Sequence, residues 1–399
     1  MVYWLASFQF LFFVLFVLFV SSWFKPFDDR MGARYALVAT GFGLRWKGNE
    51  MALNEELFKR LVETPGVPGR EEQQRVIVRE QLGELTDEVR TDALGNVIGT
   101  KKGRDDVRVM LAAHMDEIGF LVKYIDDKGF LRLQTLGGHD PANMVAQRVL
   151  VTTANGKVLR GALQPARKPP HLTRGEERKM PQHDEFFVDL GMSADAVKEA
   201  VRVGDYVTMD RTFERVGDTY ICKAMDDRAS LFVMFEALRA MRSHEATIYA
   251  VATSQEEVGL RGAAASGSAL KPTIVVALDV TLAMDIPGGG GENTVTTLGG
   301  GAAIKIMDGS LICHPKLVEH FRAIAEREGI PHQMEILPAG GTDAGGIQRL
   351  NGGVPAFTLS IPTRYVHTVN EMVSATDVQA CIDLLARYLE EAHQGDYAL

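Results

Sequence analysis

The sequence predicts an α/β fold in which helices flank a mostly parallel sheet and a small β-rich domain is inserted. Strand-like and helix-like segments alternate from Met51 onward, which is the pattern of α/β architecture. Residues 247–259 and 273–281 are short, continuously apolar runs that then turn acidic, and such runs are typical of strands buried in a parallel sheet. Between residues 120 and 210 the sequence changes to short β-like pieces separated by glycine turns, which predicts the inserted domain.

Three segments of the larger domain are predicted to be helices. Residues 54–64 and 70–85 carry apolar side chains at helical spacing. Residues 226–241 (DDRASLFVMFEALRAM) predict a third helix with Asp226 and Asp227 in its first turn, where the helix dipole favours negative charge.

The predicted insertion, residues 120–210, consists of short β-like pieces such as RVLVTT, GKVLRGAL and DYVTM, separated by turns with glycine. It also contains one long polar loop, residues 166–185. Short strands between turns are typical of a small β-rich unit. The larger α/β domain would then comprise residues 51–119 and 211–399.

The composition indicates a globular protein and argues against nucleic acid as its main partner. Hydrophobic residues make up 46% and charged residues 24% of the 399 residues, which is ordinary for a chain with a core. A net charge of −9 has the wrong sign for binding a phosphate backbone. The cysteines, Cys222, Cys313 and Cys381, are too scattered for a disulfide framework or a CxxC zinc site. A reduced, cytoplasmic setting is therefore expected.

The first 50 residues differ from the rest of the chain. The segment from Tyr3 to Phe24 is almost purely apolar and long enough to span a membrane. Basic residues follow it, from Lys25 onward, and none precedes it, so the positive-inside rule would leave the following domain in the cytoplasm. A cleaved signal peptide fits poorly, because the basic n-region and an A-x-A site are missing.

An early start codon is the alternative to a membrane anchor. Met51 begins MALNEELFKRLVETPGVPGREEQ, which looks like the start of a soluble domain with its own amphipathic helix. Codons for Lys47 and Gly48 can form a purine run that resembles a bacterial ribosome-binding site upstream of an ATG. Residues 1–50 are thus either an anchor or translated leader, and both leave the remaining domain in the cytoplasm.

Acidic or imidazole side chains follow five predicted strands. In chain order they are His114 with Asp116 after VRVMLAA, Asp226 after YICKAM, Glu256 and Glu257 after IYAVATSQ, Asp279 after IVVAL, and His367 after VPAFTLSI. In open α/β sheets, ligands collect at the carboxyl ends of the strands, beside a topological switch point. The charged side chains would converge on one crevice, where they would repel each other unless cations paired them.

Each of these residues alone has an ordinary structural explanation. A single histidine after a strand is more often structural than a ligand. The pair Asp226 and Asp227 can cap a helix, a Glu-Glu pair can be a solvated turn, and Asp279 can be another cap. The repetition weakens these explanations, because apolar strands that repeatedly end in an acid or histidine favour a metal site.

The motif series resembles a known family. AHMDEIGF, KAMDDR, TSQEEVGLRGA, ALDVTLAMDIPG, GGTDAGGIQ and IPTRYVHTVNEMV, in that order, are similar to the motifs of the tetrahedral-type glutamyl/leucyl aminopeptidases. These are cytosolic di-metal peptidases of the MH clan, some of which carry an old endoglucanase label. KPPHLTRGEERK and the DLGM…VRVGDYV run resemble that family's inserted domain. The resemblance covers about residues 53–392 and leaves residues 1–50 without a counterpart.

The resemblance implies a zinc-peptidase-like fold and a set of five ligands that holds two metals. His114 and Asp279 would hold one metal, Glu257 and His367 would hold the other, and Asp226 would bridge the two. Nitrogen and oxygen ligands without thiolate suit Zn²⁺, Co²⁺ or Mn²⁺. Two divalent ions per subunit are therefore expected.

The resemblance also implies roles for residues beside the ligands. Glu256 would be the general base, taking a proton from a metal-activated water and handing it to the leaving amine. Asp116 would hydrogen-bond to His114 and fix its tautomer. Asp343, in GGTDAGGIQ, matches a motif near the metals but has no assigned role.

The expected activity is the removal of N-terminal residues from peptides. The resemblance implies that the insertion assembles a homo-oligomer, a dodecameric tetrahedron with active sites facing an inner chamber. The alternatives are another di-metal amidohydrolase (a dipeptidase or deacetylase), a glycosidase, which needs two free carboxylates beside a sugar bond, and a non-catalytic scaffold. The preferred N-terminal residue and the native metal do not follow from the sequence.

Overall fold

The structure is a computed structural model that describes residues 53–168, 170–172 and 179–399. The apolar N-terminal segment and Met51, on which the anchor and early-start hypotheses rest, lie outside these residues. Within the described ranges, no helix combines the length and the hydrophobicity needed to cross a membrane.

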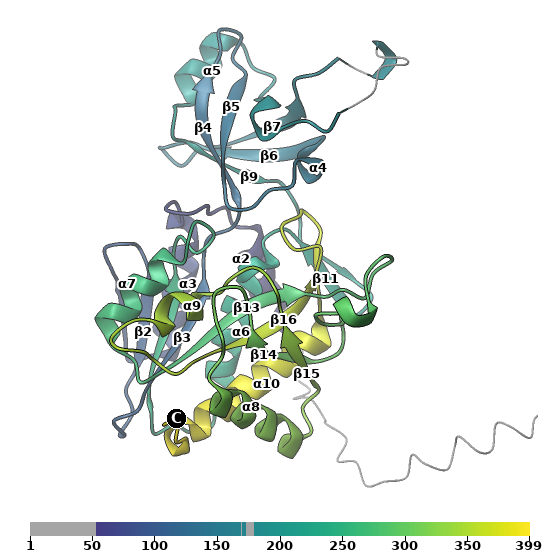
Figure 1. The fold of residues 1–399 in the computed structure, drawn as a ribbon. Helices are drawn as coiled ribbons and strands as arrows, with labels where there is room; N and C mark the ends of the chain where they lie inside the picture. The colour runs from purple at the N-terminus through teal and green to yellow at the C-terminus, as the bar shows by residue number, and fades with distance from the viewer. Residues whose placement is uncertain (1–52, 169, 173–178) are drawn as a thin grey trace, which may run out of the picture. The chain divides into compact units, whose positions relative to one another are not determined.

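A large mixed sheet forms the centre of the main domain (Figure 1). Among the described residues it has eleven strands, in the order β1-β2-β12-β3-β13-β16-β17-β11-β10, with β14 paired to β16 and β15 paired to β14. The strands are β1 (Glu88–Thr91), β2 (Val97–Lys101), β3 (Arg108–His114), β10 (Glu214–Val216), β11 (Thr219–Cys222), β12 (Thr247–Thr253), β13 (Ile274–Leu282), β14 (Ala302–Met307), β15 (His332–Ile336), β16 (Ala356–Arg364) and β17 (Glu371–Ser374).

The four central strands, β12, β3, β13 and β16, are parallel. Strand β2 pairs antiparallel to β12, and β14 and β17 pair antiparallel to β16. The predicted mostly parallel arrangement is therefore confirmed for the centre of a sheet that is mixed as a whole. Strand β3 is buried from its second residue onward, as expected when both faces of a parallel sheet are covered.

Strand direction brings five carboxyl ends to the same side of the sheet. Strand β17 is antiparallel to β16, and β11 is antiparallel to β17, so β11 runs in the same direction as the four central strands. The ends of β3, β11, β12, β13 and β16 consequently face the same edge, where side chains that follow them can meet.

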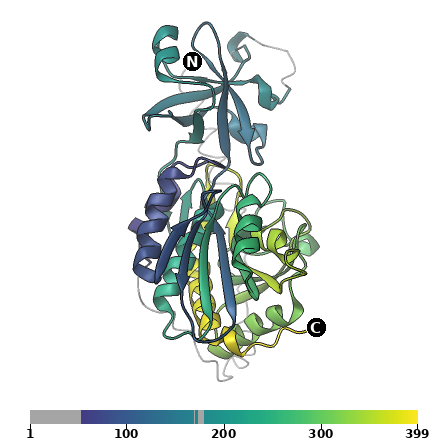
Figure 2. The same cartoon turned by 90° about the vertical axis from the view of Figure 1, so that its left-hand side faces the viewer.

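Helices cover both faces of the sheet (Figures 1 and 2). They are α2 (Glu55–Glu63), α3 (Glu72–Leu85), α6 (Met225–Ala240), α7 (Arg261–Leu270), α8 (Pro315–Glu328), α9 (Asp343–Gln348) and α10 (Ala375–Glu391). Helix α6 packs on β3 and β13 with α10 and α2 beside it, while α7 and α9 pack against each other. Helices α2 and α3 occupy the two segments whose apolar spacing predicts helices.

The start of α6 differs from the prediction. Asp226 and Asp227 have non-helical backbone angles, and Ala224 before them is left-handed with φ of 56°. The two acids therefore do not form a regular first helical turn. The irregular backbone instead separates their side chains from the helix and allows each to make its own contacts.

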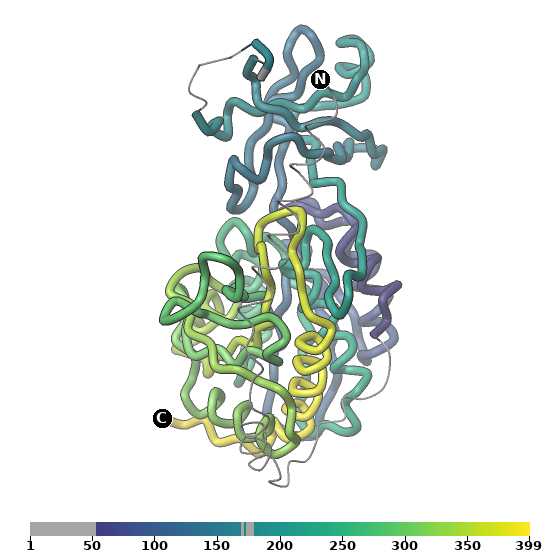
Figure 3. Tube along the Cα trace, turned by 90° about the vertical axis from the view of Figure 1, so that its right-hand side faces the viewer, coloured from purple at the N-terminus to yellow at the C-terminus, as the bar shows by residue number. Residues whose placement is uncertain are grey.

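The β-rich insertion is a closed barrel of six strands (Figure 3). Its elements are β4 (Gly119–Ile125), β5 (Leu131–Leu136), α4 (Pro141–Met144), β6 (Gln147–Thr152), β7 (Val158–Pro165), β8 (Phe186–Asp189), α5 (Ala194–Ala200) and β9 (Tyr206–Met209). The chain enters the barrel at Gly119 and leaves it after Met209, and residues such as Phe120, Val149 and Val207 form a second apolar core.

Candidate metal centre

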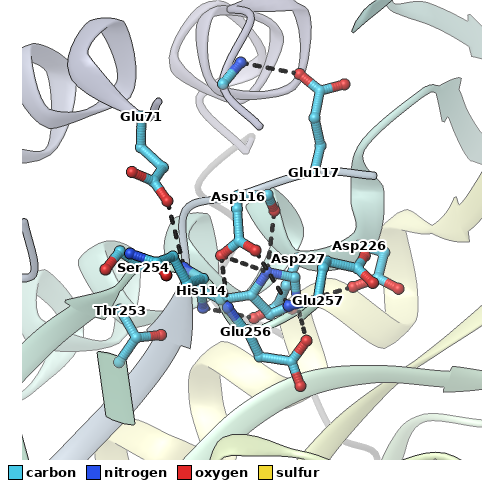
Figure 4. Close-up of polar contacts among 12 residues, drawn as sticks. Glu71, His114, Asp116, Glu117, Asp226, Asp227, Thr253, Ser254, Glu256 and Glu257 are labelled. Atoms are coloured by element: carbon cyan, nitrogen blue, oxygen red, sulfur yellow. Dashed lines mark hydrogen bonds and ion pairs between the residues drawn. The ribbon is translucent and has the colours of Figure 1, made fainter. Parts of the chain in front are cut away.

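Side chains predicted to share one crevice gather at the common edge of the sheet, and Figure 4 shows four of them close together: His114, Asp226, Glu256 and Glu257. His114 is the last residue of β3, Glu256 and Glu257 follow β12, and His367 follows β16. Asp279 differs from the prediction, because β13 continues to Leu282 and Asp279 therefore lies inside the strand. All of these residues, together with Asp226, line one open cavity of about 470 Å³. This volume is in the range of small-molecule binding sites.

The carboxylate of Asp226 lies between the two imidazoles. Its Oδ1 is 3.0 Å from Nε2 of His114, and its Oδ2 is 3.2 Å from Nε2 of His367. Oε1 of Glu257 is 3.4 Å from the same nitrogen of His367. One carboxylate thus faces two separate imidazoles with its two oxygens, which is the arrangement that a bridging ligand requires.

Two groups of donor atoms are compact enough to hold a metal ion. His114, Asp226 and Glu257 form one, and His114, Asp227 and Asp279 form the other, with the donor atoms of each group within 4.8 Å of one another. Asp227 is an addition to the predicted set. Its Oδ2 accepts the backbone N–H of His114 at 3.1 Å, and its Oδ1 has no hydrogen-bond partner among the described residues.

The orientation of His114 comes from a backbone group. Nδ1 of His114 is 3.0 Å from the backbone carbonyl oxygen of Asp116, and because a carbonyl only accepts, Nδ1 carries the proton in this contact. The carboxylate Oδ1 of Asp116 is farther away, at 3.7 Å. The predicted hydrogen bond from His114 to Asp116 is therefore made by the main chain of Asp116, and it leaves Nε2 directed at Asp226.

The carboxylate of Asp116 instead positions the loop after β12. It accepts the backbone N–H groups of Glu256 at 3.0 Å and of Glu257 at 3.1 Å. Since both residues are held by one buried acid, their side chains keep a fixed separation. The spacing of the motif in the sequence does not predict this role.

Glu371 holds two backbone N–H groups in the same way as Asp116, and it is not among the residues predicted from the sequence. Its carboxylate accepts the backbone N–H of His367 at 2.7 Å and that of Asp226 at 3.1 Å. It thereby ties the segment after β16 to the start of α6. The only sequence signal is its place in IPTRYVHTVNEMV, four residues after His367.

A buried ion pair holds the segment that precedes Asp226. Nζ of Lys223 lies 2.7 Å from Oε2 of Glu117, and Oε1 of Glu117 also accepts the backbone N–H of Gly66 at 3.2 Å. Both partners are almost fully buried. Glu117 thus neutralises Lys223, which precedes Asp226 by three residues. Both residues belong to the motifs AHMDEIGF and KAMDDR, but the sequence gives neither of them a role.

Asp343 lies at the first turn of α9, where Thr253 donates a hydrogen bond of 2.5 Å to its Oδ2. Its Oδ1 is buried without a hydrogen-bond partner among the described residues. Burial raises the pKa of Asp343 to about 6, although His114 and the bond from Thr253 oppose the shift. Asp343 is therefore close to the centre but does not line the cavity.

Burial of several acids together creates an electrostatic problem. Burial, and after it the repulsion from Asp279, raises the pKa of Asp227 well above its ordinary value. Burial and then Asp226 raise the pKa of Asp279 in the same way, and burial also raises the pKa of Glu256 despite the attraction of His114. These carboxylates stay ionised only where positive charge is close to them.

The imidazoles show the opposite response. Burial alone would lower the pKa of His367, but the neighbouring carboxylates of Asp226 and Glu257 outweigh it and raise that pKa to about 12. Burial would raise the pKa of Asp226, but its contacts with His114 and His367 outweigh burial and lower it.

These observations fit divalent cations. The donor set is imidazole nitrogen and carboxylate oxygen, which suits Zn²⁺, Co²⁺ and Mn²⁺. Buried carboxylate oxygens of Asp227 and Asp343 have no hydrogen-bond partner in the described chain, and Oε1 of Glu257 has only its 3.4 Å contact with His367. Buried charges of one sign persist only when paired or coordinated. A cation among them would satisfy the oxygens and remove the mutual repulsion.

Comparisons with known proteins identify the family of the chain. Residues 95–384 match the family described as M42 glutamyl aminopeptidase. The lysyl aminopeptidase of Pyrococcus furiosus is 38% identical over 86% of this chain and 98% of its own, and the glutamyl aminopeptidase of Lactococcus lactis is 31% identical over 81% and 92%.

Solved structures give the same result. An aminopeptidase from the archaeon Desulfurococcus kamchatkensis has a TM-score of 0.81 at 40% identity and covers 84% of this chain and 94% of its own. The TET1 peptidase of Pyrococcus horikoshii, which can assemble into a tetrahedron or a large octahedral shell, has a TM-score of 0.76 at 29% identity and covers 84% and 99%. With the family match extending over most of the chain, this protein belongs to the M42 glutamyl aminopeptidase family.

Proposed function

We propose that this chain is a metal-dependent aminopeptidase that removes N-terminal residues from peptides. The observation that carries the proposal is the carboxylate of Asp226, which faces His114 with one oxygen and His367 with the other. Membership in an aminopeptidase family supports hydrolysis of peptide bonds as the reaction at these residues.

The proposed ligands form two sets that share one carboxylate. His114 and Asp279 hold one divalent ion, Glu257 and His367 hold the other, and Asp226 bridges them. The contacts of Asp226 with both imidazoles, and of Glu257 with His367, support this division. Zinc or cobalt are the expected metals, with manganese as a third candidate.

The chain's own residues supply the proton transfers and orient the substrate. Divalent ions bound here would lower the pKa of a water molecule and stabilise negative charge on the substrate's carbonyl oxygen. Glu256, whose carboxylate lines the cavity, accepts a proton from water and later donates it to the leaving amine. The backbone N–H of Glu256 is fixed by Asp116, so the base keeps its place during turnover.

Exopeptidase action is proposed from the family match, which is to aminopeptidases. The cavity at the proposed ligands and Glu256 would hold the N-terminal residue of the peptide.

The alternative activities have less support. A glycosidase needs two free carboxylates on either side of a sugar bond, whereas here the acids are interleaved with imidazoles within 4.8 Å. A dipeptidase or deacetylase could use similar ligands, but the family match is to aminopeptidases.

We further propose that the barrel mediates assembly into a closed oligomer, a dodecamer with active sites on an inner chamber. Apolar side chains of the barrel are exposed, including Tyr124 (55%) and Val203 (66%). These side chains are available for burial against a second subunit. The tetrahedron formed by the Pyrococcus horikoshii relative supports this assignment.

A cytoplasmic location is proposed from the state of the cysteines. All three are free and buried, and burial raises the pKa of Cys222 and of Cys313 to about 12. Protonated, buried thiols are unreactive, as expected for structural cysteines in a reducing compartment. The role of residues 1–50 stays a prediction.

Removal of metal should abolish activity reversibly. After dialysis against a chelator, release of p-nitroaniline from aminoacyl-p-nitroanilides should fall to background, and added Zn²⁺, Co²⁺ or Mn²⁺ should restore it because the ligands remain in place. Carboxymethylcellulose serves as the control substrate. Full activity in the chelated, metal-free protein, or cellulose hydrolysis without amino acid release, would reject the aminopeptidase assignment.

Glu256→Gln should lower kcat by about 10²–10⁴-fold, the usual contribution of a positioned base, while both metals and the fold are retained. Elemental analysis and kinetics on the same preparation separate the two effects. Glu326→Gln, on the exposed surface of α8, is the matched control and should leave kcat unchanged. If metal content falls in proportion to activity, Glu256 is a ligand rather than the base.

Asp226→Ala should remove or severely weaken both metals, because a bridging carboxylate serves two ions and separates their charges. His367→Ala should mainly affect one. Titration with metal, followed by elemental analysis of both purified variants, measures the number of ions retained. Loss of a single metal in both variants would contradict the bridging role of Asp226.

Removing the barrel should reduce the oligomer to a monomer or small species. Leu121 of β4 and Tyr206 of β9 are cross-strand partners, so a short Gly/Ser turn can replace residues 122–205. The proposed ligands lie outside the deletion, and metal binding therefore reports whether the main domain still folds. Size-exclusion chromatography with light scattering gives the mass, and a dodecamer from the truncated protein would place the assembly surface elsewhere.

A further inference from the structure

The cavity at the proposed metal centre is lined by the proposed ligands and Glu256 and, in addition, by a group of uncharged residues, here called the wall. Sixteen residues line the cavity, of which six are the five proposed ligands and Glu256. The remaining ten are uncharged, and among the described residues no lysine or arginine lines the cavity. Asp226, Glu257 and His367 also line a second cavity, but its volume is only about 20 Å³, so the larger cavity has the room for the first side chain of a substrate bound at the ions.

Three leucines are the largest apolar side chains that line the cavity, beside Val280, Val366 and Ala339. Leu260 precedes α7, Leu282 ends β13, and Leu337 follows β15. Leu282 keeps 38% of its surface exposed although it is apolar, which is surface that a ligand could cover. Leu260 has a left-handed backbone with φ of 57°, a conformation that a leucine adopts only when its surroundings impose it. Three large apolar side chains therefore line the part of the cavity that holds no proposed ligand.

Three cations on neighbouring elements are already neutralised. Nζ of Lys305 is buried against Glu335, Lys223 pairs with Glu117, and the guanidinium of Arg364 is 2.5 Å from Asp285. None of them lines the cavity, so a substrate carboxylate would have no partner there.

A basic side chain meets a similar obstacle. The acids that line the cavity are the proposed ligands and Glu256, which are committed to the ions and to proton transfer. Oε1 of Glu335, behind the wall, is occupied by Lys305 and by the hydroxyl of Thr281 at 2.6 Å. Neither a positive nor a negative side chain of the substrate therefore finds a free counter-charge among the residues that line the cavity, and burying a charge unpaired is unfavourable.

We infer that this aminopeptidase selects peptides whose N-terminal residue is apolar and of leucine or methionine size, with Leu260, Leu282 and Leu337 as specificity determinants. The inference rests on the proposed function and narrows it. It distinguishes this chain from the relatives whose names specify lysyl and glutamyl substrates.

The test is a substrate panel with the full-length, metal-reconstituted protein. The p-nitroanilides of Leu, Met, Ala, Glu and Lys are compared by kcat/KM. Leu and Met should exceed Ala by at least about 10-fold, because methylene groups in an apolar pocket discriminate by this factor or more. They should exceed Glu and Lys by at least about 100-fold, since either charge would be desolvated without a partner.

A charge placed in the wall should redirect the preference. Leu282→Lys should raise the ratio of kcat/KM for Glu over that for Leu by at least about 10-fold, since one new ion pair becomes available to the substrate carboxylate. Leu94→Lys is the matched control, because Leu94 has the same residue type and a similar exposure of 39% but does not line the cavity. It should leave the ratio unchanged. Leu337→Lys provides a second variant if Leu282→Lys does not fold.

The outcomes separate this inference from the proposed function. Release of Glu or Lys as the best substrate would overturn the apolar preference while leaving the aminopeptidase activity intact. No release from any member of the panel, with both metals bound, would reject the proposed function itself. The wild-type panel decides the inference even without the variants.

Discussion

The concentration of buried carboxylates at one edge of the sheet is the constraint on which the rest of the structure depends. Asp226, Asp227 and Asp279 are all less than a tenth exposed, and each raises the energy of its neighbours when ionised. The chain meets this constraint with imidazoles, backbone N–H donors and oxygens left open for cations. The same arrangement that would destabilise a protein without metal therefore suits the proposed metal centre.

Main-chain geometry supplies much of the support. Asp116 holds the backbone of Glu256 and Glu257, and Glu371 holds that of Asp226 and His367. Left-handed φ angles occur at Ala224, Gln255 and His367, which precede or belong to the site. Such conformations cost energy in non-glycine residues, and they persist where surrounding contacts impose them. The acids and the strained backbone thus fix the donor atoms before any ion or substrate binds.

The fold separates the tasks of the proposed enzyme. Parallel strands bring the donor atoms together, residues of β13 and of the loop after β15 line the cavity, and the barrel offers its own exposed surface. Leu282 and Leu337 are not among the donor atoms, so the inferred specificity determinants and the proposed ligands are different residues.

The sequence alone determined the α/β class, the β-rich insertion and the family, because apolar runs and ordered motifs are local properties of the chain. It also determined which residues could be ligands, since imidazole and carboxylate groups are visible at the strand ends. It did not reveal Asp227 or Glu371, the continuation of β13 beyond Asp279, or the backbone carbonyl that orients His114. These depend on hydrogen bonds between segments distant in the chain, whose distances only the packed sheet and its loops decide.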